Sequence, residues 1–182
     1  MYDAEIRLIE GVIAKIAEGE KMKKLVVYYS ISGNTRAVAE RVATSLRADL
    51  FEIRTVKTYP DDHDVLIGLA KKEVESGYIP QIEPFEFNFD KYETVIIGTP
   101  VWWYSYAPAV KSFMAGKKWE GKKVYTFATY DGRVGHTPSD FKKALRGAEV
   151  PPTLGIKFDD NTQVTPDSDI KLWLREIRTP QK

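Results

Sequence analysis

A short run of small polar residues carries the clearest chemistry of this sequence. Residues 30–35 read Ser-Ile-Ser-Gly-Asn-Thr, between an apolar segment and a segment with helical spacing. Free N–H groups and the dipole at a helix start favour an anion, and a glycine lets the backbone approach it closely. The run predicts a phosphate site; the alternative is a simple turn and helix cap. The predicted binding residues are Ser30, Ser32, Gly33, Asn34 and Thr35.

A second run, residues 99–106, carries four large aromatic side chains where loops usually place small polar residues. Trp102, Trp103 and Tyr104 could form a wall against a planar ring while their polar atoms stay near water. The alternative is that these rings belong to the core or form a patch for a partner protein.

A third run, residues 129–135, follows another apolar segment and contains Tyr130 and two glycines. One phosphate site and two aromatic loops together outline a phosphorylated heteroaromatic ligand. His136 lies beside this run, but a lone histidine in a loop is more often a surface residue than a proton donor.

Apolar segments alternate with helical patterns, and this alternation positions the three runs. Strands are predicted at residues 25–29, 50–54, 94–98, 123–128 and 154–158. Helical patterns follow them, and Asn34 or Thr35 is expected to cap the first. Such alternation favours an α/β fold with a doubly wound parallel sheet of five strands. Ligands of such sheets lie beyond the carboxyl ends of the strands, where all three runs begin.

Residues 1–22 are predicted to form a helical extension ahead of the main domain, residues 23–182. Apolar residues recur there at helical spacing, at Ile6, Ile9, Val12, Ile13 and Ile16. This amphipathic helix needs a partner for its apolar face, either its own domain or the second subunit of a homodimer.

Composition excludes several kinds of protein. The 27 basic and 26 acidic residues give a net charge of +1, so no overall field favours nucleic acid or an anionic membrane. No apolar run approaches a membrane span, and charges interrupt the first residues, so a cytoplasmic protein is expected. The absence of cysteine excludes disulfides, thiolate metal sites and iron–sulfur clusters. The acidic residues 61–64 suit a helix start better than a metal site.

Residues 29–36 resemble the phosphate loop of the flavodoxin family, and residues 98–103 resemble its flavin-flanking loop. The resemblance covers residues 24–177 and includes a Tyr-Pro-Asp-Asp segment at 59–62 found in one subgroup. It implies an FMN cofactor whose phosphate binds residues 30–35. It also implies an isoalloxazine bordered by Pro100, Val101, Trp102, Trp103, Tyr104, Thr129, Tyr130, Asp131 and Gly132. In one departure, Tyr104 occupies a position where relatives often have glycine.

Three functions fit this interpretation, and none requires a catalytic acid or base, because the cofactor would supply the chemistry. The first is an enzyme that takes hydride from NAD(P)H, a transient substrate, and reduces a quinone or similar acceptor. The second is a one-electron carrier that docks a redox partner protein. The third is a non-redox interaction module. The near-neutral charge and Tyr104 favour the enzyme slightly, and the intact residues 30–35 argue against the module.

Overall fold

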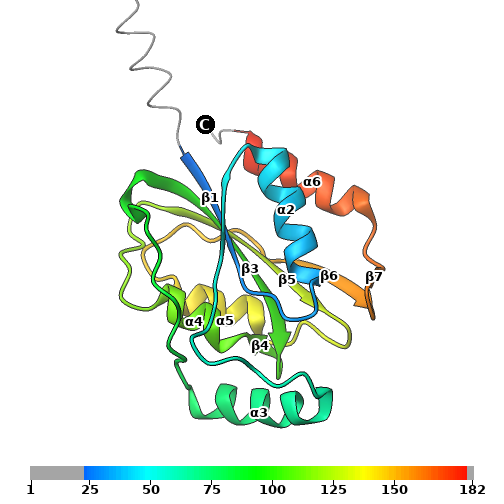
Figure 1. The fold of residues 1–182 in the computed structure, drawn as a ribbon. Helices are drawn as coiled ribbons and strands as arrows, with labels where there is room; N and C mark the ends of the chain where they lie inside the picture. Colours follow the sequence, from blue (N-terminus) through cyan, green and yellow to red (C-terminus); the bar gives the residue numbers. More distant parts are fainter. Residues whose placement is uncertain (1–22, 180–182) are drawn as a thin grey trace, which may run out of the picture.

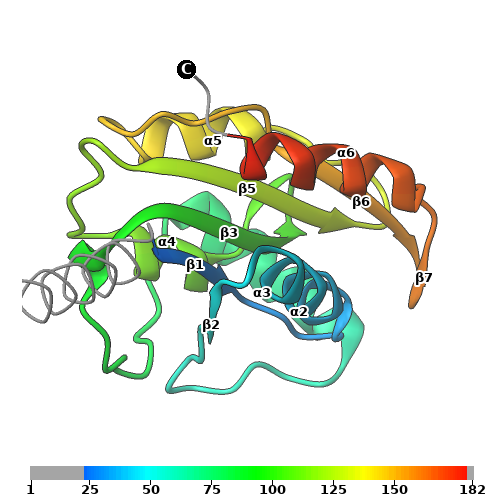
Figure 2. The same cartoon turned by 90° about the horizontal axis from the view of Figure 1, so that it is seen from above.

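The structure is a computed structural model that describes residues 23–179, with a mainly parallel sheet at its centre (Figure 1). The parallel strands are β1 (Lys23–Tyr28), β2 (Asp49–Glu52), β3 (Tyr92–Trp102), β5 (Lys123–Tyr130) and β6 (Leu154–Asp159). They lie in the order β2-β1-β3-β5-β6, which can be followed in Figure 2. This is a doubly wound order whose direction reverses between β1 and β3.

Within residues 23–179 the sheet has seven strands, so the prediction of five was wrong. The two further strands have two residues each: β4 (Ser105–Tyr106) is antiparallel to β3, and β7 (Thr162–Gln163) is antiparallel to β6. Both form where a long strand turns back on itself, and two residues are too few to leave a strand pattern in the sequence. The predicted strand 94–98 extends to Trp102, so the aromatic run is a hairpin rather than an open loop.

Within the described residues, five α-helices cover the sheet. Helices α2 (Asn34–Leu46) and α6 (Asp167–Arg178) pack on one face, against a core that includes Val26 and Phe127. Helices α3 (His63–Ser76), α4 (Pro108–Met114) and α5 (Thr137–Ala144) belong to the other face, whose core includes Val27. A short 3-10 helix, η1 (Phe89–Lys91), precedes β3. Neighbouring residues of β1 face opposite cores because side chains alternate along a strand.

Two parts of the sequence prediction remain outside this description. The helix and the homodimer contact predicted for residues 1–22 lie outside the described residues. Among residues 23–179, no helix has the length and apolar character needed to cross a membrane.

Gly98 in β3 should tolerate no larger side chain. A Cβ at this position would lie 2.2 Å from Cζ of the fully buried Phe127. We expect Gly98→Ala to lower the free energy of unfolding by about 2 kcal/mol, because the ring has no room to move. Gly68→Ala is the matched control: a Cβ there meets nothing within 4 Å. It should stabilise α3 by about 0.5 to 1 kcal/mol. Urea unfolding of both variants measures this, and equal effects would contradict the packing argument.

Candidate functional site

The three runs identified in the sequence meet at the carboxyl edge of the sheet. Residues 30–35 follow β1, residues 103–107 follow β3, and residues 131–136 follow β5. A hydrogen bond of 2.7 Å joins the hydroxyls of Thr35 and Thr129, which lie on different runs and are both buried. Figure 1 shows α3 beyond the arrowhead of β3, across this edge. The edge is therefore bordered by the three runs and by one helix.

The start of α2 has unused hydrogen-bonding capacity. Its N-cap is Gly33, in the left-handed region at φ 95°, and this residue has no side chain with which to cap the helix. The prediction that Asn34 or Thr35 provides the cap was therefore wrong. Ser30 Oγ accepts hydrogen bonds from the N–H groups of Gly33 (3.2 Å) and Arg36 (3.3 Å), so its own hydrogen can be donated outward. The N–H groups of Asn34 and Thr35 have no partner among the described residues. A helix start with free N–H groups beside such a hydroxyl is suited to an anion.

Two neighbouring side chains are engaged away from this helix start. The Asn34 amide donates to the backbone carbonyl of Asp160, in the turn between β6 and β7, at 2.8 Å. The Arg36 guanidinium pairs with Glu52 on β2, and this pairing raises the pKa of Arg36. Ser32 is exposed. An anion here would thus be held mainly by neutral donors, as the composition of the run suggests.

The turn between β3 and β4 has an unusual backbone. Trp102 pairs with Ser105, which leaves Trp103 and Tyr104 as a two-residue turn, and both have positive φ, 41° and 67°. Such turns normally contain glycine, asparagine or aspartate, since other side chains are disfavoured in the left-handed region. Tyr104 therefore occupies a conformation that glycine adopts more readily.

The hairpin is held in place by the helix that follows β5. The Tyr104 carbonyl accepts a hydrogen bond of 2.9 Å from the His136 N–H. Ser105 Oγ donates to Asp140 at 2.7 Å, and the His136 ring contacts the same carboxylate. Although burial opposes ionisation, these two hydrogen bonds hold the pKa of Asp140 below its usual value. The strained turn is thus fixed from outside by α5.

The two tryptophans of the hairpin point in different directions. Trp102 is only 7% exposed, and its ring packs edge-on against Tyr29 and Tyr59, at centroid distances of 5.9 and 4.9 Å. Trp103 is half-buried and lies against Tyr104, which is 48% exposed. Most of the Trp102 ring therefore contributes to the core, and Trp103 and Tyr104 are the aromatic residues at the surface.

The segment before α3 positions that helix beside the hairpin. The Asp62 carboxylate accepts from the Val65 N–H at 3.0 Å and caps the helix, which confirms a helix start in the acidic segment. The Tyr59 hydroxyl donates to Glu73 at 2.7 Å, and burial together with this acceptor raises the pKa of Tyr59. Tyr59 therefore links α3 to Trp102 through one hydrogen bond and one ring contact.

A cavity of about 310 Å³ lies between α3, the hairpin and the run after β5. The hairpin contributes Val101, Trp102, Trp103 and Tyr104, and the third run contributes Asp131, Gly132 and Arg133. The α3 wall consists of His63, Leu66, Ile67 and Ala70. The sequence prediction did not include Arg133 or this wall. The wall residues lie at helical spacing (i, i+3, i+4, i+7), so the signal was present in the sequence.

Some predicted site residues lie outside the cavity lining. Thr129 is buried against Thr35, and Pro100 continues β3 beside it. The Tyr130 ring lies against the backbone of Gly155 in β6, where a Cβ would be 3.2 Å from its Cε1 atom. Residues 30–35 do not line the cavity either, and they contact the third run through the hydrogen bond between Thr35 and Thr129. The structure thus forms two connected parts, a polar helix start and an aromatic cavity.

A profile of the family described as Flavodoxin matches residues 23–175, which is most of the chain. This chain belongs to the flavodoxin family. No curated protein sequence matches it. Among solved structures, it is similar to a candidate flavoprotein from Bacteroides eggerthii, with 26% identity and a TM-score of 0.72 over 86% of this chain and 98% of that one.

Two more solved structures share the fold. A flavoprotein from Lactobacillus acidophilus, in complex with FMN, has 24% identity and a TM-score of 0.68, covering 84% of this chain and 98% of that chain. A flavodoxin from the domain Archaea has 21% identity and a TM-score of 0.53, covering 85% and 92%. The flavodoxin fold predicted from the three runs is confirmed.

Tyr104→Gly should stabilise this flavodoxin-family protein. Glycine adopts the observed φ of 67° without the steric cost that tyrosine incurs, so we expect a gain of about 1 kcal/mol in the free energy of unfolding. Tyr104→Ala is the control, because it also removes the contact with Trp103 but keeps a Cβ in the left-handed region. Thermal unfolding should show a gain for the glycine variant only. A gain for both would indicate that the ring, not the backbone, is the unfavourable element.

Proposed function

We propose that this protein binds FMN at the carboxyl edge of its sheet and passes electrons or hydride as a cytoplasmic oxidoreductase. When bound, FMN would supply the redox chemistry by accepting and donating one or two electrons. The observation that carries the proposal is the start of α2, where the Asn34 and Thr35 N–H groups have no partner among the described residues, near an aromatic cavity. FMN combines a phosphate with a planar ring.

The phosphate fits the donors of residues 30–35. The start of α2 offers the backbone N–H groups of Asn34 and Thr35, and the same run carries the Ser30 and Thr35 hydroxyls. Arg36 is paired with Glu52, so these neutral donors would carry most of the binding. A set of oriented N–H and O–H donors suits a phosphate monoester.

The planar ring fits the cavity between the hairpin and the third run. The cavity volume of about 310 Å³ lies at the lower end of the range for small-molecule sites. Trp103 and Tyr104 provide aromatic surface at its mouth, and Ile67 of α3 is 44% exposed there. The rigid hairpin would hold these rings in a fixed position against the ligand.

The cations around this cavity favour the reductase over a simple carrier. Arg133 belongs to the lining, and the Lys71 ammonium lies 4.7 Å from the Trp103 ring centroid. These groups could attract the phosphates of NAD(P)H to the flavin face, where a quinone would then be reduced. The second candidate, a one-electron carrier, is favoured by the exposed Tyr104 and Ile67, which offer an apolar surface to a redox partner protein.

FMN titration tests the phosphate site. Thr35→Val removes a hydroxyl donor, and we expect the dissociation constant for FMN to rise at least about tenfold, as for a lost hydrogen bond to a charged group. Thr126→Val is a matched control, because Thr126 is also buried and its hydroxyl lies 2.8 Å from that of Thr153, away from the runs. Quenching of flavin fluorescence gives the constants. No binding by the wild-type protein would overturn the FMN proposal and leave the interaction module.

NADPH oxidation distinguishes reductase from carrier. The FMN-loaded protein should oxidise NADPH in the presence of a small quinone, followed by the loss of NADPH absorbance. Arg133→Met should lower kcat/KM for NADPH about fivefold, which matches the loss of one partly solvated charge interaction. Arg146→Met, at an exposed arginine just beyond the C-terminal end of α5, should leave kcat/KM for NADPH unchanged. If the FMN-loaded protein does not oxidise NADPH, the reductase proposal is wrong and the one-electron carrier is supported.

A further inference from the structure

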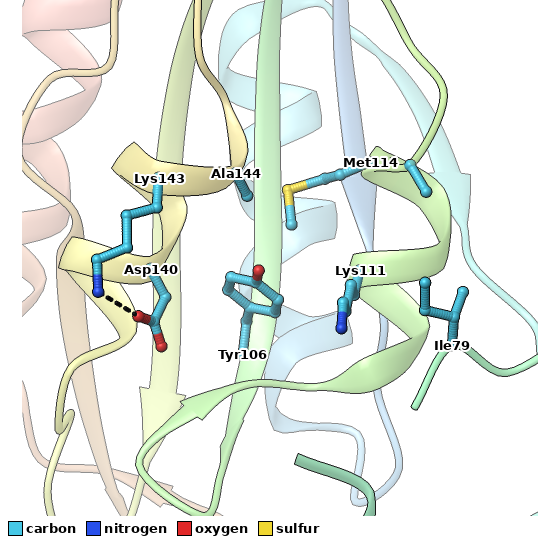
Figure 3. A pocket seen from close by; sticks show the side chains of 8 residues that line it. Ile79, Tyr106, Lys111, Met114, Asp140, Lys143 and Ala144 are labelled. Atoms are coloured by element: carbon cyan, nitrogen blue, oxygen red, sulfur yellow. Dashed lines mark ion pairs between the residues drawn. The ribbon is translucent and has the colours of Figure 1, made fainter. Parts of the chain in front are cut away.

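A second cleft lies between α3, α4 and α5, beside the short strand β4. Two cavities of about 360 and 210 Å³ share Tyr106, Lys111 and Asp140 in their linings. Figure 3 shows the Tyr106 side chain between Asp140, Lys143 and Ala144 on one side and Lys111 and Met114 on the other. None of the three shared residues lines the cavity proposed for the flavin ring.

The acidic group of this cleft is already satisfied. Asp140 accepts from Ser105 and from the His136 ring, and Lys143 lies 3.5 Å from its other oxygen. Glu73, at the edge of the smaller cavity, accepts from Tyr59. The Asp140 and Glu73 carboxylates are therefore both engaged with donors of the protein itself.

The hydrogen-bond donors of the cleft, in contrast, have N–H and O–H groups without acceptors. Lys111 Nζ donates one hydrogen bond, 2.6 Å long, to the Gly77 carbonyl, which leaves two N–H groups on the ammonium. The Tyr106 hydroxyl has no hydrogen-bond partner within residues 23–179. Its side chain is half-buried, and this burial raises the pKa of the phenol. An ammonium with two N–H groups left and a phenol without an acceptor line one cavity, and such donors are suited to an anionic oxygen ligand.

The remaining lining of the larger cavity is apolar. Met114, Ala144 and Ile79 contribute side chains around Tyr106, and Figure 3 shows the Met114 thioether directed toward the cavity. The Tyr106 ring packs on Phe141 at a centroid distance of 5.0 Å, so it forms a supported flat surface. A thioether and a supported ring favour contact with another aromatic ring.

We propose that this cleft binds a small aromatic carboxylate, whose carboxylate accepts hydrogen bonds from Lys111 and Tyr106 and whose ring lies against Met114 and Ala144. The site is separate from the proposed FMN site and lies on the other side of the β3–β4 hairpin. It does not depend on the redox function, since its donors belong to the protein alone. Ser105 and Tyr106 directly follow the Trp103–Tyr104 turn. A ligand in the cleft would therefore contact the β3–β4 hairpin.

Sodium benzoate is the probe for this site, followed by amide NMR of the full chain. We expect saturable shifts at residues 106, 111, 114 and 144, with a dissociation constant near about 1 mM, as suits a ligand with few atoms. Benzamide has the same shape without the charge, and acetate has the charge without the ring; both should bind at least about fivefold more weakly. Shifts that do not saturate by about 10 mM benzoate, or equal binding of acetate, would overturn the proposal.

Variants connect the binding to the two donors. Tyr106→Phe keeps the ring on Phe141 and should weaken benzoate binding about tenfold, and Lys111→Met should weaken it at least as much. Lys118→Met, at an exposed lysine just beyond α4, should bind benzoate as the wild type does. Unchanged affinity in Tyr106→Phe would refute the role of the phenol even if Lys111→Met failed to fold.

The same titration with saturating FMN separates this site from the flavin site. Benzoate binding should persist, with shifts at the same residues. Complete loss of benzoate binding when FMN is added would place the carboxylate in the flavin site and overturn the second site. If the protein does not bind FMN at all, the benzoate titration still tests the cleft, so the two proposals can fail independently.

Discussion

The hydrogen-bond ladder of β3 is the constraint on which the rest of the structure depends. This strand pairs with β1 on one side and β5 on the other, and every side chain from Thr94 to Thr99 is buried. An unpaired backbone group in such a place would be costly, so the register cannot slip. Gly98 is level with Tyr28 and Phe127 in this register. The runs that follow the three strands consequently leave the sheet at one edge and at similar heights.

The fixed carboxyl edge of the sheet allows the strained Trp103–Tyr104 turn to persist. Two consecutive non-glycine residues in the left-handed region persist only where their surroundings determine them strongly. Here the Tyr104 carbonyl is held by the His136 N–H, and Ser105 is held by Asp140. The Thr99 hydroxyl also accepts from the Ala107 N–H at 3.0 Å and closes the base of the hairpin. Ser105, His136 and Asp140, which fix the turn, also line the cleft between α3, α4 and α5. The two candidate sites therefore share the rigid β3–β4 hairpin.

Local patterns were informative wherever a residue's neighbours in the sequence are also its neighbours in space. Apolar runs located the parallel strands, and the acidic segment marked the start of α3, because helix capping and side-chain alternation act over a few residues. The same reasoning failed for β4 and β7, whose two residues carry no periodic pattern. It also assigned a cap to α2 from Asn34 or Thr35, whereas both side chains bond to distant segments.

The sequence by itself determined the family, the alternation of strands and helices, and the polar and aromatic runs at the sheet edge. Only the tertiary structure decided how those runs are used. It turned Trp102 toward the core and left Trp103 at the surface, and it brought the α3 wall to the hairpin. It also paired Thr35 with Thr129 and Asn34 with Asp160. These partners lie 94 and 126 positions apart, and such contacts follow from the packing of the whole sheet, which no short segment encodes.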